Sequence, residues 1–240
     1  MTDRLERVGA GRHGARSPAL LALLLLASAV WTQAAPAAVQ QSQALATLHA
    51  AHEAYAGPAR TSTRIELVRS RRPLTGERTV LPVIGATTRW LHVRLPGRPN
   101  GSSGWIRRAA TVESTTPWRL VVELGRRRVV AYRMGRAVLT ARAVVGKPST
   151  PTPRGEYFVE EDVRLRSADV GAPFALALSA RSNVLQEFDG GPGQIALHGL
   201  ANVGGRLGTA ASHGCIRLDS ATMRWLVVHI GPGVPVTISK

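Results

Sequence analysis

Apolar and polar residues alternate through much of the chain with a period of two, which is the pattern of a β-strand with one buried face. The run WLHVRL at 90–95 is the plainest case. Similar short runs predict strands at 65–68, 80–84, 104–106, 120–124, 129–134, 137–145, 157–163, 174–180, 194–198 and 234–239. The 24 glycines and 15 prolines favour frequent turns, so we predict a mainly β fold.

One segment near the C-terminus has convincing helical signals. Residues 221–229 follow Asp219 or Ser220, either of which would serve as the N-cap, and Gly231-Pro232 would stop the helix. We therefore predict a single short helix there.

A second segment, at 40–55, is rich in alanine and glutamine and predicts a short helix or tether inside a linker at 38–58. His49 and His52 lie three residues apart in it, with Glu53 beside them, a spacing that could bind a metal ion. We favour a solvated linker face, because no further ligand cluster is near in sequence.

The predicted strands form two blocks. The block at 59–112 has the strand rhythm of a small β-barrel and closes on Gly104-Trp105-Ile106, so it resembles bacterial SH3-like modules. This block either positions the protein against a cell wall or its substrate, or acts as a spacer. The block at 117–239 is more hydrophobic and contains the candidate chemistry.

The first 37 residues have the pattern of a secretory signal peptide. Four arginines precede an apolar run at 19–31, which is too short to span a bilayer, and Ala35-Pro36-Ala37 fits a cleavage site. We predict export to a cell wall or periplasm, with cleavage favoured over an uncleaved anchor. A buried helix is the other interpretation.

The net charge of +16 then favours anionic partners. Because the chain is predicted to leave the cytoplasm, an anionic cell envelope fits better than nucleic acid. Contact with a membrane is expected only if the signal stays uncleaved.

The single cysteine, Cys215, excludes an intrachain disulfide. A lone thiol in an oxidising compartment is either buried and inert or present for its reactivity.

A histidine upstream of this cysteine gives the thiol a candidate base. His198 ends a predicted strand, and the Gly199 carbonyl can accept its second ring N–H. Gly214 permits a tight turn before Cys215, which would leave the amides of both residues free for an oxyanion. Arg217 lies on the same side of an extended segment and could hold a substrate carboxylate.

Two other interpretations of this stretch remain open. One is a buried cysteine near two unrelated histidines. The other is a zinc site made by His198, His213 and Cys215 with a water, although the stretch offers no carboxylate base. We expect no metal and no cofactor.

These residues also carry a resemblance to a known family. His198-Gly199 followed by Ser212-His213-Gly214-Cys215-Ile216-Arg217-Leu218 resembles the active-site signature of the L,D-transpeptidase catalytic domain, or YkuD domain. The similarity covers about 118–239 and includes Gly146-Lys147 and the residues at 150–155. The gap between His198 and Ser212 is at the short end for the family, and Arg217 stands where many members have asparagine.

The resemblance implies a β-sandwich fold with a substrate cleft. It implies Cys215 as the nucleophile, His198 as general base and acid, and the Gly199 carbonyl as the group that orients the imidazole. It also places Ser212, His213 and Gly214 at the site as support and Arg217 against the substrate.

The implied substrate is a peptidoglycan tetrapeptide stem, which would acylate the thiol as a thioester and then form a 3→3 cross-link. Water or an envelope protein as acceptor would give L,D-carboxypeptidase activity or protein anchoring. A cysteine peptidase of another fold is disfavoured, because such enzymes commonly place the cysteine before the histidine. A basic, non-enzymatic wall-binding protein is the remaining alternative.

Overall fold

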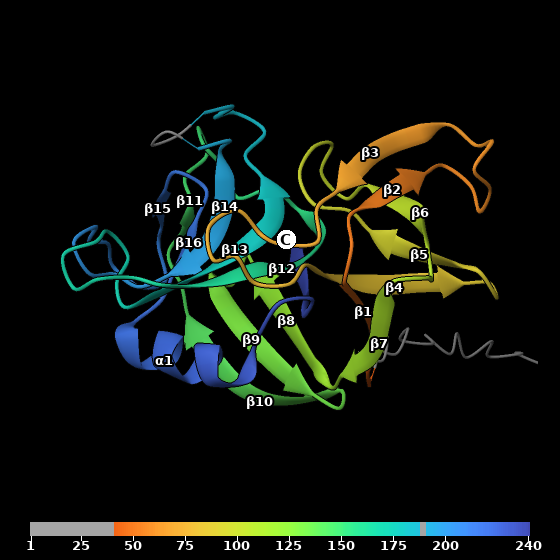
Figure 1. The fold of residues 1–240 in the computed structure, drawn as a ribbon. Coiled ribbons are helices and arrows are strands. Elements are labelled where there is room, and N and C mark those ends of the chain that lie inside the picture. The colour runs from red at the N-terminus through yellow and green to blue at the C-terminus, as the bar shows by residue number, and fades with distance from the viewer. Residues whose placement is uncertain (1–40, 188–190) are drawn as a thin grey trace, which may run out of the picture. The chain divides into compact units, whose positions relative to one another are not determined.

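The structure is a computed structural model that describes residues 41–187 and 191–240 (Figure 1). The predicted signal peptide lies outside the described residues. The described part belongs to one compact unit and is mainly β, as predicted, with a single helix among its elements. No helix in this part is long and apolar enough to cross a membrane.

The first seven strands form one antiparallel sheet, called here the N-terminal sheet. Its strand order is β3-β2-β6-β5-β4-β1-β7. The strands are β1 (Gln43–Leu48), β2 (His52–Tyr55), β3 (Arg64–Val68), β4 (Val80–Ala86), β5 (Trp90–Arg94), β6 (Ser103–Arg107) and β7 (Thr111–Thr116). The predicted β character is confirmed, and the likeness to an SH3-like barrel stays a prediction.

The helix or tether predicted at 40–55 is wrong, because β1 and β2 occupy this segment. Alternate residues of β2 are buried, and Ala46 and Ala54 are fully buried under the sheet. Pairing of β1 with β4 and β7, and of β2 with β3 and β6, therefore overrides the helical propensity of alanine. The N-terminal sheet therefore begins at Gln43, within the predicted linker.

The solvated linker face predicted for the two histidines is also wrong at His52, which is 6% exposed. Its two ring nitrogens lie 2.8 Å from the Ala50 carbonyl oxygen and 2.9 Å from that of Ala109. These contacts tie the start of β2 to the connection between β6 and β7.

The second sheet, called the C-terminal sheet, has the order β10-β9-β8-β17-β12-β13-β14-β16. Its strands are β8 (Trp118–Glu123), β9 (Arg128–Arg133), β10 (Arg136–Arg142), β12 (Gly155–Arg164), β13 (Phe174–Arg181), β14 (Gln194–His198), β16 (Ile216–Arg217) and β17 (Pro235–Ser239). A small parallel pair, β11 (Val145–Gly146) and β15 (Ala210–Ser212), accompanies it.

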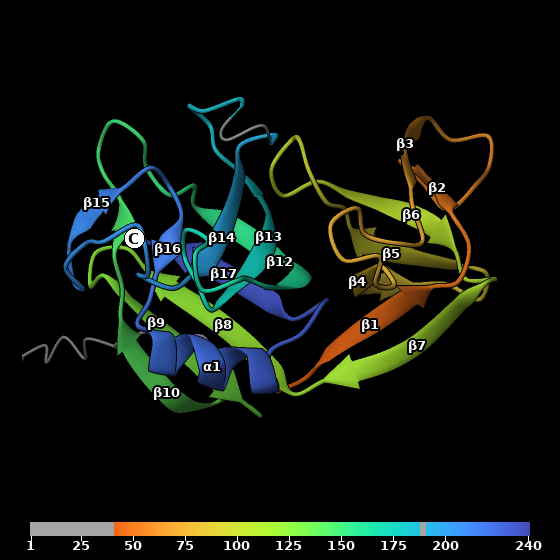
Figure 2. The ribbon, with the colours of Figure 1, turned by 60° about the vertical axis from the view of Figure 1, so that its left-hand side comes forward.

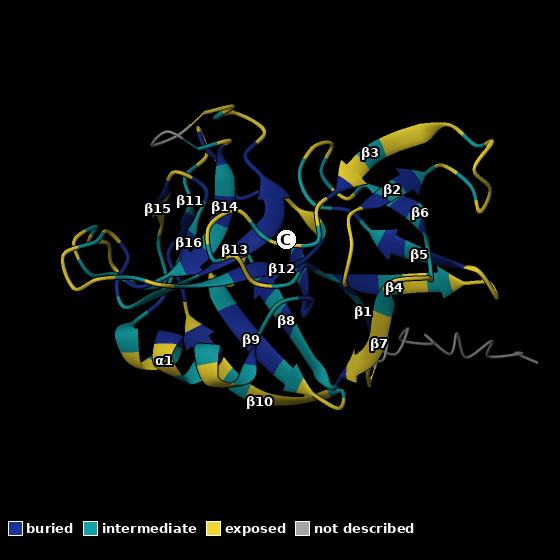
Figure 3. Ribbon diagram, viewed as in Figure 1, coloured by how far each residue is buried: buried dark blue, intermediate teal, exposed yellow. Residues whose placement is uncertain are grey.

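Strand β12 connects the two halves of the C-terminal sheet. Its first residues pair with β17, and from Val159 onward it pairs with β13. A register shift between Val159 and Glu161 marks the change, which is where a β-bulge lets a strand bend. Figure 3 shows a buried run at 157–161 in this strand and a second one at 176–181 in its partner β13.

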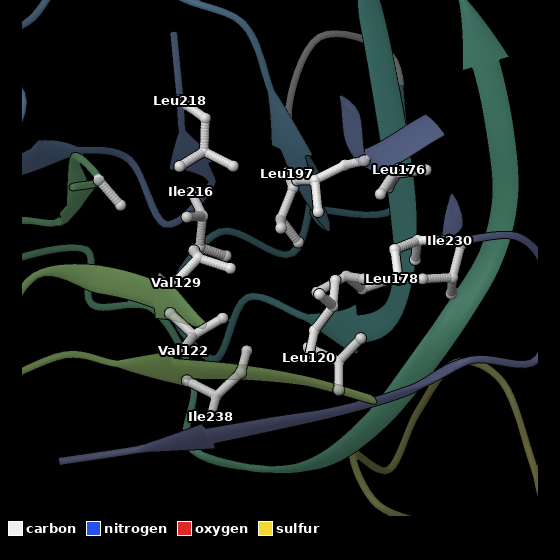
Figure 4. Close-up of a cluster of buried hydrophobic side chains, with 14 of the residues drawn as sticks. Leu120, Val122, Val129, Leu176, Leu178, Leu197, Ile216, Leu218, Ile230 and Ile238 are labelled. Atoms are coloured by element: carbon white, nitrogen blue, oxygen red, sulfur yellow. The ribbon is translucent and has the colours of Figure 1, made fainter. Parts of the chain in front are cut away.

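The two halves face each other across one hydrophobic core, as in the expected β-sandwich. Figure 4 shows side chains of the two halves gathered in one cluster. The labelled members are Leu120, Val122, Val129, Leu176, Leu178, Leu197, Ile216, Leu218, Ile230 and Ile238. The core therefore fixes the position of the edge strand β16 and of its neighbour β14.

The single helix, α1 (Ser220–His229), is confirmed at its predicted place (Figure 2). Asp219 is the N-cap, and its carboxylate accepts the Thr222 amide. Trp225 packs edge-on against Trp118 of β8, with ring centroids 5.7 Å apart. The helix thus begins directly after β16 and is held against β8.

Candidate active site

The cysteine and the upstream histidine lie on neighbouring strands. Strands β14 and β16 are parallel, with Leu197 opposite Ile216 and His198 opposite Arg217. Leu197 and Ile216 are fully buried in the core. Because side chains alternate across a strand, His198 and Arg217 lie on the other face of the sheet, and Cys215 directly precedes β16. The pairing therefore places His198 opposite Arg217, with Cys215 at the start of the neighbouring strand.

A backbone carbonyl orients the imidazole of His198. Its Nδ1 lies 2.8 Å from the Gly199 carbonyl oxygen, so Nδ1–H donates there and Nε2 has the free lone pair. Burial lowers the pKa of His198, the Gly199 hydrogen bond opposes this, and the charge of Arg217 lowers the pKa further. His198 is therefore neutral at neutral pH, as a general base must be.

Gly171 packs against the imidazole and was missed by the sequence analysis. A Cβ at this position would collide with Nδ1 of His198, and the backbone φ of +83° suits glycine. Its carbonyl accepts the Gly199 amide at 2.7 Å, and its amide donates to Ala201 at 2.8 Å. No motif marks Gly171, because its contact with His198 is made across a distant part of the chain.

The thiol of Cys215 is largely enclosed. It lines a cavity of about 20 Å³, which has room for about one water molecule. The cavity is lined by Ser182, Leu185, Gly193, Gln194, Ile195, His213 and Cys215. Sγ donates to the Gln194 carbonyl oxygen at 3.9 Å. Burial raises the pKa of the thiol, opposed by a hydrogen bond from the Ala196 backbone and by the charge of Arg217.

The turn before Cys215 is closed by Ser212. Its hydroxyl donates to the Cys215 carbonyl oxygen at 2.6 Å and accepts the Gly214 amide at 3.1 Å. Gly214 has a φ of +124°, as expected for a glycine that permits a tight turn. The prediction that the Gly214 amide is free for an oxyanion is wrong, because Ser212 takes this donor. Of the two predicted oxyanion donors, the Cys215 amide is the one that Ser212 does not bind.

The residues at 146–152 support this turn through two buried threonines. Thr152 Oγ1 accepts the Gly146 amide at 2.9 Å and donates to the Gly214 carbonyl at 2.7 Å. Thr150 Oγ1 donates to the Ser212 carbonyl at 3.2 Å. The motif noted in the sequence therefore holds the backbone on both sides of residue 213.

Arg217 and His213 lie at the site in different ways. The Arg217 guanidinium donates to the Gly204 carbonyl at 3.3 Å and to that of Val203 at 3.5 Å. His213 is exposed and lines the thiol cavity. Within residues 41–187 and 191–240, no three His, Cys, Asp or Glu side chains are placed to hold one metal ion.

A β-sandwich in which His198 ends β14 and Cys215 directly precedes the neighbouring strand β16 is the framework of a cysteine-dependent acyl-transfer site. The particular family follows from comparison of the sequence. Residues 117–238 match the profile of YkuD, the L,D-transpeptidase catalytic domain. The chain therefore belongs to the L,D-transpeptidase catalytic domain family, whose members are acyl-transferring enzymes.

Two curated relatives come from Bacillus. The protein named L,D-transpeptidase YkuD in Bacillus licheniformis is 31% identical over 128 residues, which cover 52% of this chain and 67% of the relative. The protein of the same name in Bacillus subtilis is 28% identical over 129 residues, which cover 52% of this chain and 68% of the relative.

Solved structures of L,D-transpeptidases are also similar. L,D-transpeptidase 3 from Mycobacterium tuberculosis has a TM-score of 0.45 at 15% identity, covering 68% of this chain and 91% of that chain. An L,D-transpeptidase from Mycobacterium smegmatis has a TM-score of 0.41 at 17% identity, with the same coverage.

Proposed function

We propose that this protein is an exported peptidoglycan L,D-transpeptidase with Cys215 as its nucleophile and His198 as its general base and acid. The observation that carries the proposal is the pairing of β14, which ends at His198, with β16, which directly follows Cys215, together with the contact of His198 Nδ1 with the Gly199 carbonyl. This arrangement leaves Nε2 available to the sulfur. Membership of the family supplies the reaction class.

The first half-reaction transfers an acyl group to the enzyme. Nε2 of His198 takes the thiol proton, and the thiolate attacks the carbonyl carbon at the L-centre of the third stem residue. The Cys215 amide donates to the oxyanion. The tetrahedral intermediate collapses as His198 returns the proton to the leaving D-alanine amine, and a thioester remains on Cys215.

The second half-reaction decides the product. Attack by the side-chain amine of another stem releases the thiol and forms a 3→3 cross-link. Water in place of the amine gives the L,D-carboxypeptidase reaction, and an amine of an envelope protein gives anchoring. All three acceptors use the same thioester, so they share Cys215 and His198.

Arg217 is proposed to stabilise charge at the site. Its positive charge lowers the pKa of Cys215 and thereby favours the thiolate. The guanidinium bonds to the carbonyls of residues 203 and 204 are long, at 3.5 and 3.3 Å. A substrate carboxylate would replace them with stronger charge-assisted hydrogen bonds.

Export is the other part of the proposal. The signal-like pattern at 1–37 and the charge of +16 both fit a protein that works in an anionic envelope. Fractionation of cells that express the full chain or a chain without residues 1–37 tests it. Export predicts that only the full chain reaches the wall or periplasm, and equal retention of both in the cytoplasm would contradict it.

Product analysis tests the reaction. Purified, reduced wild-type protein is incubated with a disaccharide-tetrapeptide beside Cys215→Ala and a control variant, Arg108→Ala, whose residue lies in the connection between β6 and β7. Wild type and control are expected to release D-alanine and form a cross-linked dimer, and Cys215→Ala neither.

Each other outcome has a definite meaning. D-alanine release without a dimer would contradict the transpeptidase assignment and identify a carboxypeptidase. No D-alanine from folded wild-type protein would contradict the enzymatic proposal and favour a wall-binding protein.

A further inference from the structure

A loop of the N-terminal sheet binds the backbone next to the thiol cavity. The loop connects β5 to β6 and contains Asn100. Asn100 Nδ2 donates to the Arg181 carbonyl at 2.7 Å, and Asn100 Oδ1 accepts the Arg181 amide at 2.8 Å. A single side-chain amide thus pairs with both main-chain groups of Arg181, as a neighbouring strand would.

The same loop also contacts residues that follow Arg181 in the chain. Asn100 Nδ2 also donates to Asn183 Oδ1 at 3.1 Å, and the Arg98 guanidinium approaches the Leu185 carbonyl at 3.5 Å. The loop therefore contacts the segment 181–185 at three places along its length.

This segment forms one wall of the cavity at Cys215, because Ser182 and Leu185 line it. Ser182 Oγ accepts the amides of Val184 and Leu185 at 3.2 and 2.9 Å, which closes a compact turn. The Ser182 amide donates to the Gly193 carbonyl at 2.8 Å. The turn has its own local hydrogen bonds. Asn100 fixes Arg181, the last residue of β13, directly before this turn.

A second contact ties another cavity residue to the N-terminal sheet. The fully buried carboxylate of Glu160 forms an ion pair with Arg72, which lies between β3 and β4, and accepts a hydrogen bond from Gln194 Nε2 at 3.2 Å. The Gln194 carbonyl is the group that accepts the thiol of Cys215. Two separate routes therefore run from the N-terminal sheet to the cavity.

We propose that Asn100 is a positioning residue of the active site, through which the N-terminal sheet holds the wall formed by Ser182 and Leu185 against the Cys215 thiol. The inference rests on the proposed function for its catalytic meaning. Its structural content, that Asn100 limits access to the thiol, holds whatever reaction Cys215 performs. It assigns the N-terminal sheet a part in the active site and not only a spacing role.

The lone cysteine makes a direct test available. Iodoacetamide alkylates thiols, so its reaction with the whole protein reports on Cys215 alone. Asn100→Ala removes all three hydrogen bonds. Asn100→Asp keeps the shape and the acceptor for the Arg181 amide, and loses the donors to the Arg181 carbonyl and Asn183. Arg108→Ala is the matched control, because it loses hydrogen bonds to Glu113 and Thr87 within the N-terminal sheet.

Both Asn100 variants are expected to raise the alkylation rate about threefold or more, because the wall opens locally more often. Arg108→Ala is expected to leave the rate at the wild-type value. The urea dependence of the alkylation rate separates local from global opening. If the thiol is exposed by a local opening, the rate changes little at low urea concentrations, whereas if it is exposed by global unfolding, the rate rises steeply with urea.

Wild-type rates in both Asn100 variants would overturn the inference, as would increases that follow the global unfolding dependence. Acylation by the tetrapeptide is measured in parallel and is expected to slow in both variants. If wild-type protein is not acylated at all, the proposed function fails, and the alkylation comparison still decides the role of Asn100.

Discussion

At the scale of single residues, the candidate nucleophile and base are both buried enough to favour their uncharged forms. Burial is the largest cause in each case: it raises the pKa of the Cys215 thiol and lowers the pKa of the His198 imidazole. The free enzyme therefore contains a neutral thiol and a neutral imidazole and not an ion pair. Proton transfer is expected to accompany attack on the substrate.

The pH dependence of alkylation tests this protonation state. Because the folded pKa is raised, the reactive thiolate appears only as pH rises above the range of a free thiol. We expect the midpoint of the iodoacetamide rate profile to lie higher for folded protein than for the same chain in concentrated urea. A lower midpoint in the folded protein would show that the thiol is activated before substrate binds.

Gly171→Ala tests the contact that orients the base. The added methyl group would collide with Nδ1 of His198, and the positive φ disfavours alanine. We expect D-alanine release to fall by about tenfold or more, because a small displacement of a catalytic group is costly. Gly76→Ala is the control, since its φ is also positive and its Cβ would meet no atom within 4 Å. Equal activity of the two variants would contradict the positioning role of Gly171.

At the scale of elements, the site depends on a short turn that has little regular structure of its own. Strands β15 and β16 contain three and two residues, and the turn between them includes Gly214. Its carbonyls are held by Thr150 and Thr152 from the loop before β12. The elements that hold the turn are thus distant in sequence, although they are fixed by hydrogen bonds in the fold.

Thr152→Val tests this support at nearly constant side-chain volume. It leaves the Gly146 amide and the Gly214 carbonyl without their buried partner, which costs about 1–3 kcal/mol of unfolding free energy. Urea unfolding measures the loss, and Thr237→Val, which removes a part-buried hydroxyl bonded to the side chains of Arg119 and Glu156, provides the comparison. A Thr152→Val protein as stable as wild type would contradict the argument.

The sequence predicted elements well where the signal was local. Strand β14 has the predicted bounds, and α1 is capped by Asp219, one of the two predicted N-caps, because alternation and capping are encoded in neighbouring residues. The prediction for the segment at 40–55 failed because β1 and β2 pair with strands far along the chain, which buries Ala46 and Ala54. Local composition carries no information about such pairing.

The candidate site shows the same difference between features encoded locally in the sequence and contacts made between distant residues. The cysteine, the histidine and the orienting glycine were recognisable because they form a compact signature in the sequence. Gly171 and Asn100 were not, because each acts through a contact made only in the folded chain. The freedom of the Gly214 amide was misjudged because a hydroxyl two residues away competes for it.

At the scale of the whole molecule, buried charge on β12 connects the two sheets. Glu160 and Glu161 are each 1% exposed, and their partners include Arg72 and the backbone amide of Thr75 from the N-terminal sheet. Removal of one partner from such a network leaves an unpaired buried charge. The neighbouring Asp162 differs, because burial and the charge of Glu77 raise its pKa to about 6.

Asp162 therefore gives stability a defined pH dependence. Because the folded pKa of Asp162 exceeds its unfolded value, ionisation of this carboxyl lowers the free energy of unfolding. The loss is absent below about pH 4, grows up to about pH 6 and is complete above it. Asp162→Asn is expected to raise the unfolding free energy by about 1–2 kcal/mol at pH 7.5, and by little at pH 4, after allowance for partial exposure. Urea unfolding at the two pH values measures this. A gain that is larger at pH 4 would contradict the sign.

The most direct test of the central claim is the intact mass of the protein after brief exposure to the disaccharide-tetrapeptide. The account predicts that wild-type protein gains the mass of the stem without its terminal D-alanine, as a thioester that hydroxylamine removes, and that Cys215→Ala gains nothing. An adduct of the same mass on Cys215→Ala, or none on folded, reduced wild-type protein, would contradict a thioester acyl-enzyme at Cys215.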